Sequence, residues 1–192
     1  MRIYFTGCHA SGKSTLARFT SKEYNLPFLS EVARTVLAEK EISLETLRVN
    51  LDAIDQYQTE VFYRQINEES KHSSFVSDRS FDNLAYMAQH GTQLHKLIND
   101  EGCQNYIKSL KDKDVVIFLV KPSKATMKND GVRESVNWDQ MVAIDANIKF
   151  MFELFNLNYI QINSESMQER VRLIRSVLSY SSLESPKLSV KS

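Results

Sequence analysis

Eight residues near the start of the chain have the types and spacing needed to bind phosphate. Residues 7–14 read Gly-Cys-His-Ala-Ser-Gly-Lys-Ser and match G-x-x-x-x-G-K-[ST] at every fixed position. In this pattern the backbone N–H groups of a turn surround phosphate oxygens, and the following helix adds the positive end of its dipole. The Lys13 amine would reach the β- and γ-phosphates of a nucleoside triphosphate, and the Ser14 hydroxyl would ligate Mg²⁺. We expect nucleotide contacts from Gly7, Cys8, His9, Ala10, Ser11, Gly12, Lys13, Ser14 and Thr15.

A second set of candidate site residues follows the apolar residues near position 76. Asp78 is placed to hold the water shell of the metal, and Arg79 to contact a transferring phosphoryl group with two parallel hydrogen bonds. The alternative is a helix-capping aspartate followed by a solvated arginine. Asp82, one turn later, either orients Arg79 or the substrate, or supports the first turn of the helix.

A third group follows the apolar residues near position 28. The Glu31 carboxylate is suited to accept a proton from a substrate hydroxyl, and Arg34 to bind a substrate phosphate or polarise the acceptor. The alternative is an ion pair on the surface. Tyr57 and Gln58 offer the aromatic face and amide that a nucleobase pocket needs, and the alternative for both is a place in the core.

Four cations lie in the polar segment after residue 120. Placed over a triphosphate, they would neutralise developing charge and exclude water when the segment closes. Arg133 is the best candidate among them, and the lysines are more typical of a solvated loop. Asp145, on an apolar helix face, indicates a structural salt bridge, because an unpaired buried charge is costly. The four cations are Lys121, Lys124, Lys128 and Arg133.

Strands and helices alternate along the whole chain, which predicts an α/β protein with a parallel, doubly wound sheet. Ligands bind such sheets at the carboxyl ends of the strands, so the groups above should converge there. Ser43 is expected to cap a long helix whose apolar face includes Leu51 and Ile54. The last helix is expected to bury Met167, among others. The predicted strands are 2–6, 27–30, 74–77, 115–120 and 159–162.

The bulk composition narrows the class of protein. The 192 residues favour a single domain over 1–179, with a lid near 123–137 and a flexible tail over 180–192. The net charge of zero argues against a dedicated nucleic-acid binder. Two cysteines make no disulfide framework, and no signal peptide or membrane-spanning run is evident, so a cytoplasmic location and no membrane partner are expected.

Taken in order, these motifs resemble a known family. They are residues 7–16, Ser30-Glu31-Val32-Ala33-Arg34, residues 78–86 and Asp130-Gly131-Val132-Arg133. The set is similar to P-loop kinases around the NadR-type ribosylnicotinamide kinase domain, classed as a small AAA domain, and to deoxynucleoside and thymidylate kinases.

The resemblance implies a three-layer P-loop NTPase fold with a mainly five-stranded sheet in the order 2-3-1-4-5. It also implies ATP and Mg²⁺ as cofactors and phosphoryl transfer to a small acceptor, a nucleoside or nucleotide. A homodimer is compatible with it.

Two other functions remain open. Some phage kinases of this broad class act on a modified base in DNA, although the neutral net charge weighs against a DNA substrate. A P-loop ATPase or GTPase that drives a partner is the other alternative. Residues 121–130 hold Lys128-Asn129-Asp130 but no guanine-reading N-K-x-D motif.

Overall fold

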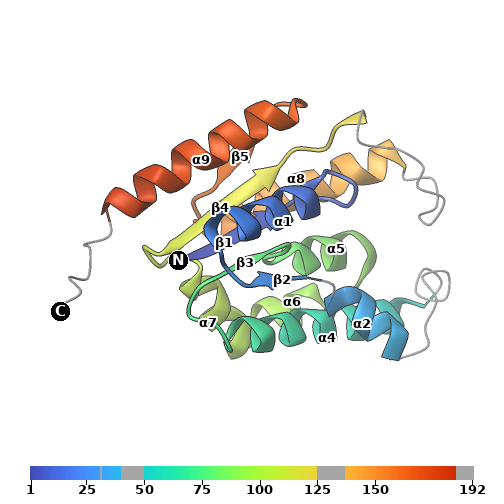
Figure 1. Ribbon diagram of the computed structural model, residues 1–192. Coiled ribbons are helices and arrows are strands. Elements are labelled where there is room, and N and C mark those ends of the chain that lie inside the picture. The colour runs from blue at the N-terminus through green and yellow to red at the C-terminus, as the bar shows by residue number, and fades with distance from the viewer. Residues whose placement is uncertain (31, 40–49, 125–136, 185–192) are drawn as a thin grey trace.

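A five-stranded, all-parallel sheet forms the middle layer of the protein in a computed structural model, which describes residues 1–30, 32–39, 50–124 and 137–184 (Figure 1). The strand order is β2-β3-β1-β4-β5. The predicted fold class and strand order are therefore confirmed. The strands are β1 (Arg2–Thr6), β2 (Phe28–Leu29), β3 (Phe75–Ser77), β4 (Val115–Val120) and β5 (Ile160–Ile162).

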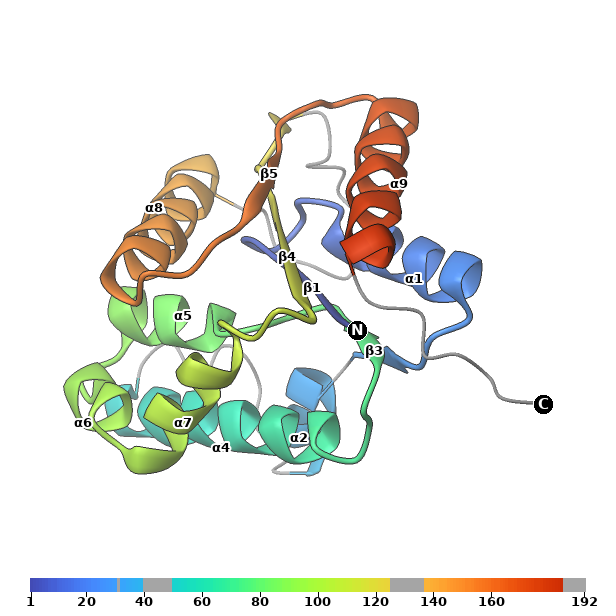
Figure 2. The ribbon, with the colours of Figure 1, turned by 90° about the vertical axis from the view of Figure 1, so that its left-hand side faces the viewer.

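The two faces of the sheet build two separate cores, because successive side chains of a strand point to opposite faces. Ile3 and Phe5 of β1 face α1 (Lys13–Tyr24) and α9 (Met167–Glu184). Tyr4 belongs to the larger core on the other face, under α4 (Leu51–Glu69), α5 (Asp82–His90), α7 (Glu101–Ser109) and α8 (Trp138–Leu154). Figure 2 shows α1 and α9 on one side of the sheet and α5 and α8 on the other. Both faces are covered, which explains why β4 is an uninterrupted apolar run.

The helices of the larger face form two tiers. α5 lies between α4 and α8, and α2 packs on α4 through a small cluster that includes Val36, Ile54 and Val61. None of the helices in the described part of the chain is long and apolar enough to cross a membrane. The bounds are α2 (Val32–Glu39), α4 (Leu51–Glu69), α5 (Asp82–His90), α6 (Leu94–Ile98), α7 (Glu101–Ser109) and α8 (Trp138–Leu154).

The prediction that Ser43 caps the long helix is wrong. α4 begins at Leu51, and its cap is Asn50, which has an extended backbone and accepts a hydrogen bond from the Ala53 N–H at 3.1 Å. Leu51, the first residue of α4, is 53% exposed instead of lying in the core. The start of α4 is therefore set by the capping residue Asn50 and not by the apolar spacing, which extends further toward the N-terminus.

The end of the chain also differs from expectation. α9 continues to Glu184, so the first residues of the predicted tail, from 180 onward, are helical. Residues 185–192 lie outside the described part, as do residues 125–136 of the predicted lid. Met167, expected in the core, is exposed.

A buried carboxyl group lies at the base of the larger core. Glu69 accepts hydrogen bonds from Tyr4 at 2.9 Å, from Gln65 at 2.8 Å and from Tyr106 at 3.4 Å. Burial raises the pKa of Glu69 to about 7, although these hydrogen bonds oppose the rise. The folded protein therefore holds this proton over a pH range in which the unfolded chain has lost it.

We expect stability to fall between about pH 4.5 and pH 7 because of Glu69. Its contribution is fully present below the ordinary carboxyl pKa of 4.5 and is lost as the pH rises through about 7. The loss should be on the order of 2–3 kcal/mol. Urea unfolding at pH 5 and pH 8 measures it, and Glu69→Gln should flatten the profile because it cannot ionise.

Glu68→Gln is the matched control, since the neighbouring Glu68 is partly exposed and pairs with Lys71. Its pH profile should follow that of the unmodified chain. An equal flattening by both substitutions would contradict the assignment to Glu69.

Candidate active site

The phosphate-loop motif connects β1 to α1 at the carboxyl ends of β1 and β4. Gly7 has φ of 147°, and a Cβ on it would lie 2.7 Å from the Val120 carbonyl oxygen, so only glycine fits there. Gly12 has φ of 90° and is the N-cap of α1. Ala10 is also left-handed, with φ of 57°, which costs about 1–2 kcal/mol for a residue with a Cβ. The turn is thus held in a conformation that the sequence does not favour by itself.

Lys13 folds back over this turn. Its Nζ donates to the Cys8 carbonyl oxygen at 3.1 Å, and the side chain is buried. An ammonium group has three donors, and this bond uses one of them. Ser14 is half-buried in the first turn of α1, and Thr15 is exposed. The Lys13 amine therefore lies against the loop in which it is predicted to bind phosphate.

The cysteine of the loop has no reactive character. Cys8 is fully buried in the larger core. Burial raises the pKa of its thiol to about 12 against the opposing charge of Lys13. The thiol is therefore protonated at neutral pH and acts as a small apolar side chain.

Asp82 anchors the beginning of the loop. Its Oδ1 accepts from the Thr6 hydroxyl and from the Gly7 N–H, the latter at 3.1 Å. Burial raises the pKa of Asp82, while Lys13, the Thr6 hydroxyl and Arg79 oppose that rise. Asp82 also lies in the first turn of α5, as expected, and its contacts with the end of β1 are an additional role that the sequence did not indicate.

The carboxylates at this edge fit a hard cation. Asp78 Oδ1 and Asp82 Oδ2 are buried and have no hydrogen-bond partner within the described residues. Those residues contain no group of three or more His, Cys, Asp and Glu side chains that could hold a metal by itself. Mg²⁺ typically takes one or two carboxylates together with substrate phosphates, and Ser14 with Asp78 matches that requirement.

Arg79 lies at the centre of the site. Burial raises the pKa of Tyr57, Asp82 and Tyr86, and the charge of Arg79 opposes the rise in all three. The charge of Arg79 therefore acts on side chains of α4 and α5, including the anchor of the phosphate loop. Its backbone N–H donates to the Ser77 hydroxyl at 3.4 Å.

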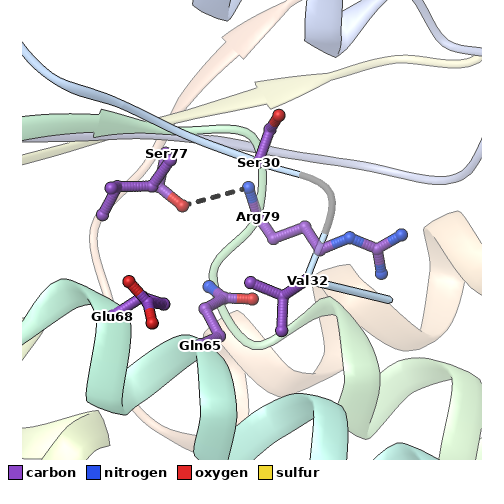
Figure 3. A pocket seen from close by; sticks show the side chains of 7 residues that line it. Ser30, Val32, Gln65, Glu68, Ser77 and Arg79 are labelled. Carbon is purple, nitrogen blue, oxygen red and sulfur yellow. Dashed lines mark hydrogen bonds between the residues drawn. The ribbon is translucent and has the colours of Figure 1, made fainter. Parts of the chain in front are cut away.

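A small pocket opens beside Arg79, between the ends of β2 and β3 and helix α4. Figure 3 shows Ser30 and Val32 on one wall and Gln65 and Glu68 of α4 on another. Gln65 Nε2 donates to the Ser80 carbonyl oxygen at 3.1 Å, which fixes α4 to the β3–α5 connection. The pocket is lined by Leu29, Ser30, Val32, Gln65, Glu68, Ser77 and Arg79.

Three predicted site residues cannot be compared with the structure. Glu31 and Arg133 lie outside the described residues, as does the side chain of Arg34. Ser30 and Val32, which flank Glu31 in the sequence, both line the pocket beside Arg79. The roles of Glu31, Arg34 and Arg133 stay predictions.

Tyr57 and Gln58 have different surroundings. Tyr57 is buried in the small cluster between α2 and α4, which agrees with a place in the core. Gln58 Oε1 accepts from Asn83 Nδ2 at 2.8 Å, and Asn83 Oδ1 is buried without a partner in the described part. Gln58 and Asn83 together thus have a donor and an acceptor that this bond does not use.

The carboxylate of Asp145 has the partner expected for it. Its Oδ2 pairs with Lys149 Nζ at 2.8 Å, one helical turn away. This geometry matches the predicted structural salt bridge.

Sequence reasoning missed two side chains that contact the phosphate loop. The Tyr86 hydroxyl accepts from the His9 N–H at 3.0 Å and lies 2.9 Å from His9 Nδ1. Arg170, at the start of α9, donates to the Ser11 carbonyl oxygen. Arg170 lies one helical turn before the buried Ile174, so its place on the apolar face could have been read from the sequence. Nothing in the sequence marks Tyr86 as a contact of the loop.

The sequence from residue 2 to residue 170 matches the family model described as AAA domain. The chain belongs to the AAA domain family. No curated protein matches its sequence. The resemblance inferred from the motifs is thus confirmed at the level of the family.

Solved structures with the same fold include three kinds of protein. A NadR protein in complex with NR has 18% identity and a TM-score of 0.67, and the match covers 98% of this AAA domain chain and 53% of that protein. Deoxyadenosine kinase from M. mycoides has 14% identity and a TM-score of 0.66, over 94% and 100% of the two chains. Shikimate kinase from Aquifex aeolicus has 18% identity and a TM-score of 0.57, over 96% and 100%.

We expect Thr6 and Asp82 to be energetically coupled. Thr6→Val removes the hydroxyl that Asp82 accepts, so Thr6→Val, Asp82→Ala and the double substitution form a double-mutant cycle. Removing a partner from a buried carboxylate should cost about 1–3 kcal/mol, and the coupling should be about 1–2 kcal/mol. Urea unfolding of the four proteins measures it.

Thr20→Val serves as the matched control. Thr20 is equally buried, but its hydroxyl donates to the Leu16 carbonyl oxygen at 2.9 Å. Its effect should add to that of Asp82→Ala. Additivity in the Thr6 cycle as well would show that Asp82 does not anchor the loop.

Proposed function

We propose that this AAA domain transfers the γ-phosphoryl group of ATP, with Mg²⁺, to a nucleoside, nucleotide or related small metabolite. The observation that supports it best is the position of Arg79. This arginine lines the pocket between β2, β3 and α4, and its charge also acts on Asp82, which holds the phosphate loop. A cation shared by a phosphate loop and a neighbouring pocket is what a group moving between them requires.

The donor half consists of the phosphate loop and its supports. Loop amides and Lys13 bind the triphosphate, and Ser14 and Asp78 hold the metal. Bound Mg²⁺ would neutralise charge on the phosphates. Lys13 can exchange the neutral Cys8 carbonyl for a phosphate oxygen, which makes the stronger, charge-assisted hydrogen bond.

The acceptor half includes the small pocket beside Arg79, which has room for about one water molecule and so holds only part of the acceptor. The acceptor hydroxyl oxygen bonds to the γ-phosphorus, the bond from that phosphorus to the bridging oxygen breaks, and ADP leaves. Glu31 takes the proton of the hydroxyl, and Arg34 orients the acceptor. Arg79 and Arg133 stabilise the transferring group, the latter from the lid.

The solved structures support an acceptor of moderate size. Among the similar structures, a NadR protein is in complex with NR, a deoxyadenosine kinase has dCMP and dCDP bound, and a shikimate kinase from Acinetobacter baumannii is in complex with shikimate. The Gln58–Asn83 pair, with Tyr57 beside it, suits the polar edge of a base or carboxamide, since it has both a donor and an acceptor. A nucleoside or nucleotide is therefore favoured over DNA.

Two wider expectations accompany the proposal. A cytoplasmic location stays a prediction from the sequence. A homodimer is proposed on α8, where Val142, Phe150 and Leu154 are exposed apolar side chains.

We expect Lys13→Ala to lower phosphoryl transfer by about 100-fold or more, because it removes a preorganised positive charge at the phosphates. The assay uses γ-labelled ATP with a panel of nucleosides, nucleoside monophosphates, nicotinamide riboside, shikimate and oligonucleotides. Lys22→Ala, in the last turn of the same helix, should have no effect.

The panel separates the competing functions. Transfer that is unchanged by Lys13→Ala for every acceptor would refute the proposal. Rapid hydrolysis of ATP without dependence on any acceptor would favour an ATPase, and salt-sensitive transfer to oligonucleotides would favour a DNA kinase.

We expect Gln58→Ala to raise the KM of the acceptor about tenfold and to leave the KM of ATP unchanged, because the Gln58–Asn83 pair is proposed to bind the acceptor. The loss corresponds to one hydrogen bond of about 1.4 kcal/mol. Gln56→Ala is the matched control on the exposed face of the same helix. A change in the KM of ATP alone would contradict this placement.

A further inference from the structure

Arg170 is a fully enclosed cation on an otherwise apolar helix face. Its side chain is 2% exposed. Ile174 and Leu178, one and two turns later, belong to the core between α9 and the sheet. Burying a charge in such a place is costly unless other groups compensate it, so the guanidinium needs an explanation beyond packing.

The guanidinium joins two loops at the carboxyl edge of the sheet. Its Nη1 donates to the Ser11 carbonyl oxygen at 3.0 Å, and its Nε donates to the Ser164 carbonyl oxygen at 2.6 Å. Ser11 belongs to the phosphate loop, and Ser164 lies between β5 and α9. A Cβ on Gly12 would lie 3.1 Å from Nη1, so the close approach depends on that glycine.

The compensation within the described residues is incomplete. Arg170 makes no salt bridge there, and its Nη2 is buried without a hydrogen-bond partner. Among the described residues, Glu165 is the acidic group whose charge acts on Arg170, and its carboxylate also accepts from the Ser123 hydroxyl. The positive charge behind the phosphate loop is therefore only partly balanced by the described residues.

The hydrogen bond from Arg170 to the Ser11 carbonyl oxygen also affects the N–H group on the other side of the same peptide, that of Gly12. The Ser11 carbonyl and the Gly12 N–H belong to one planar trans peptide, so they point in opposite directions. A cation on the carbonyl fixes the plane of this peptide and polarises its N–H as a donor. In the phosphate-loop pattern, that N–H is one of the groups that surround phosphate.

We propose that Arg170 is a positioning residue for the phosphate loop, which orients the Ser11–Gly12 peptide and adds a buried positive charge that a bound triphosphate balances. It acts through the backbone and does not need to touch the nucleotide. The inference rests on the proposed binding of ATP by this loop. It adds that the first turn of α9 is part of the nucleotide site.

The test is the affinity for ATP with Mg²⁺, measured by titration calorimetry on the full chain without an acceptor. Arg170→Met should weaken binding tenfold or more, and Arg170→Lys should recover part of the loss because it restores the charge but not the two-pronged donor. Arg172→Met, an exposed arginine on the same helix, should bind like the unmodified chain. Thermal unfolding without ATP shows whether each variant is folded.

The outcomes separate this inference from the proposed function. If the unmodified chain does not bind ATP, the proposed function fails. If it binds ATP, Lys13→Ala does not, and folded Arg170→Met binds as tightly as the unmodified chain, only the role of Arg170 is overturned. If Arg170→Met does not fold, Arg170→Lys decides: weaker binding than Arg172→Met supports the role, and equal binding overturns it.

Discussion

The site depends on one buried carboxylate, that of Asp82. It has been removed from water at a high energetic cost, and the Thr6 hydroxyl, the Gly7 N–H and the Lys13 charge offset that cost. Thr6 ends the central strand, while Asp82 begins α5, so the bond fixes the strand to the helix. Because the same helix carries Asn83 and Tyr86, the loop and the Gln58–Asn83 pair share one rigid support.

Buried polar groups recur where layers of this protein meet. Asp82 joins the strand end to α5, Glu69 joins α4 to β1 and α7, and Arg170 joins α9 to two loops. Apolar side chains can pack in several relative positions of two elements, whereas a buried charged group keeps its hydrogen bonds in only one of them. The apolar faces therefore supply the driving force for folding, and these polar contacts fix the relative positions of the elements.

The local patterns were sufficient for the fold and for the donor loop. The apolar run of β4, the alternation of strands with helices and the fixed positions around Lys13 each have one natural interpretation. They failed where two distant segments decide the outcome. The start of α4 was placed too early because the apolar period continues past a cap at Asn50. Arg170 was missed because the spacing of apolar residues predicts which face of a helix is buried, but not which distant loop packs against that face. The hydrogen bond between Gln58 and Asn83 likewise could not be predicted, because the two residues are distant in the sequence and meet only in the folded protein.

The position of Lys13 has a consequence for what the loop can accept. Its amine donates to the Cys8 carbonyl oxygen, so a ligand that accepts this hydrogen bond from Lys13 competes with that oxygen. A neutral oxygen entering the loop would only exchange one ordinary hydrogen bond for another. An anionic oxygen gains from the charge as well. On the proposed function, this exchange at Lys13 favours an anionic ligand over a neutral sugar or base in the loop.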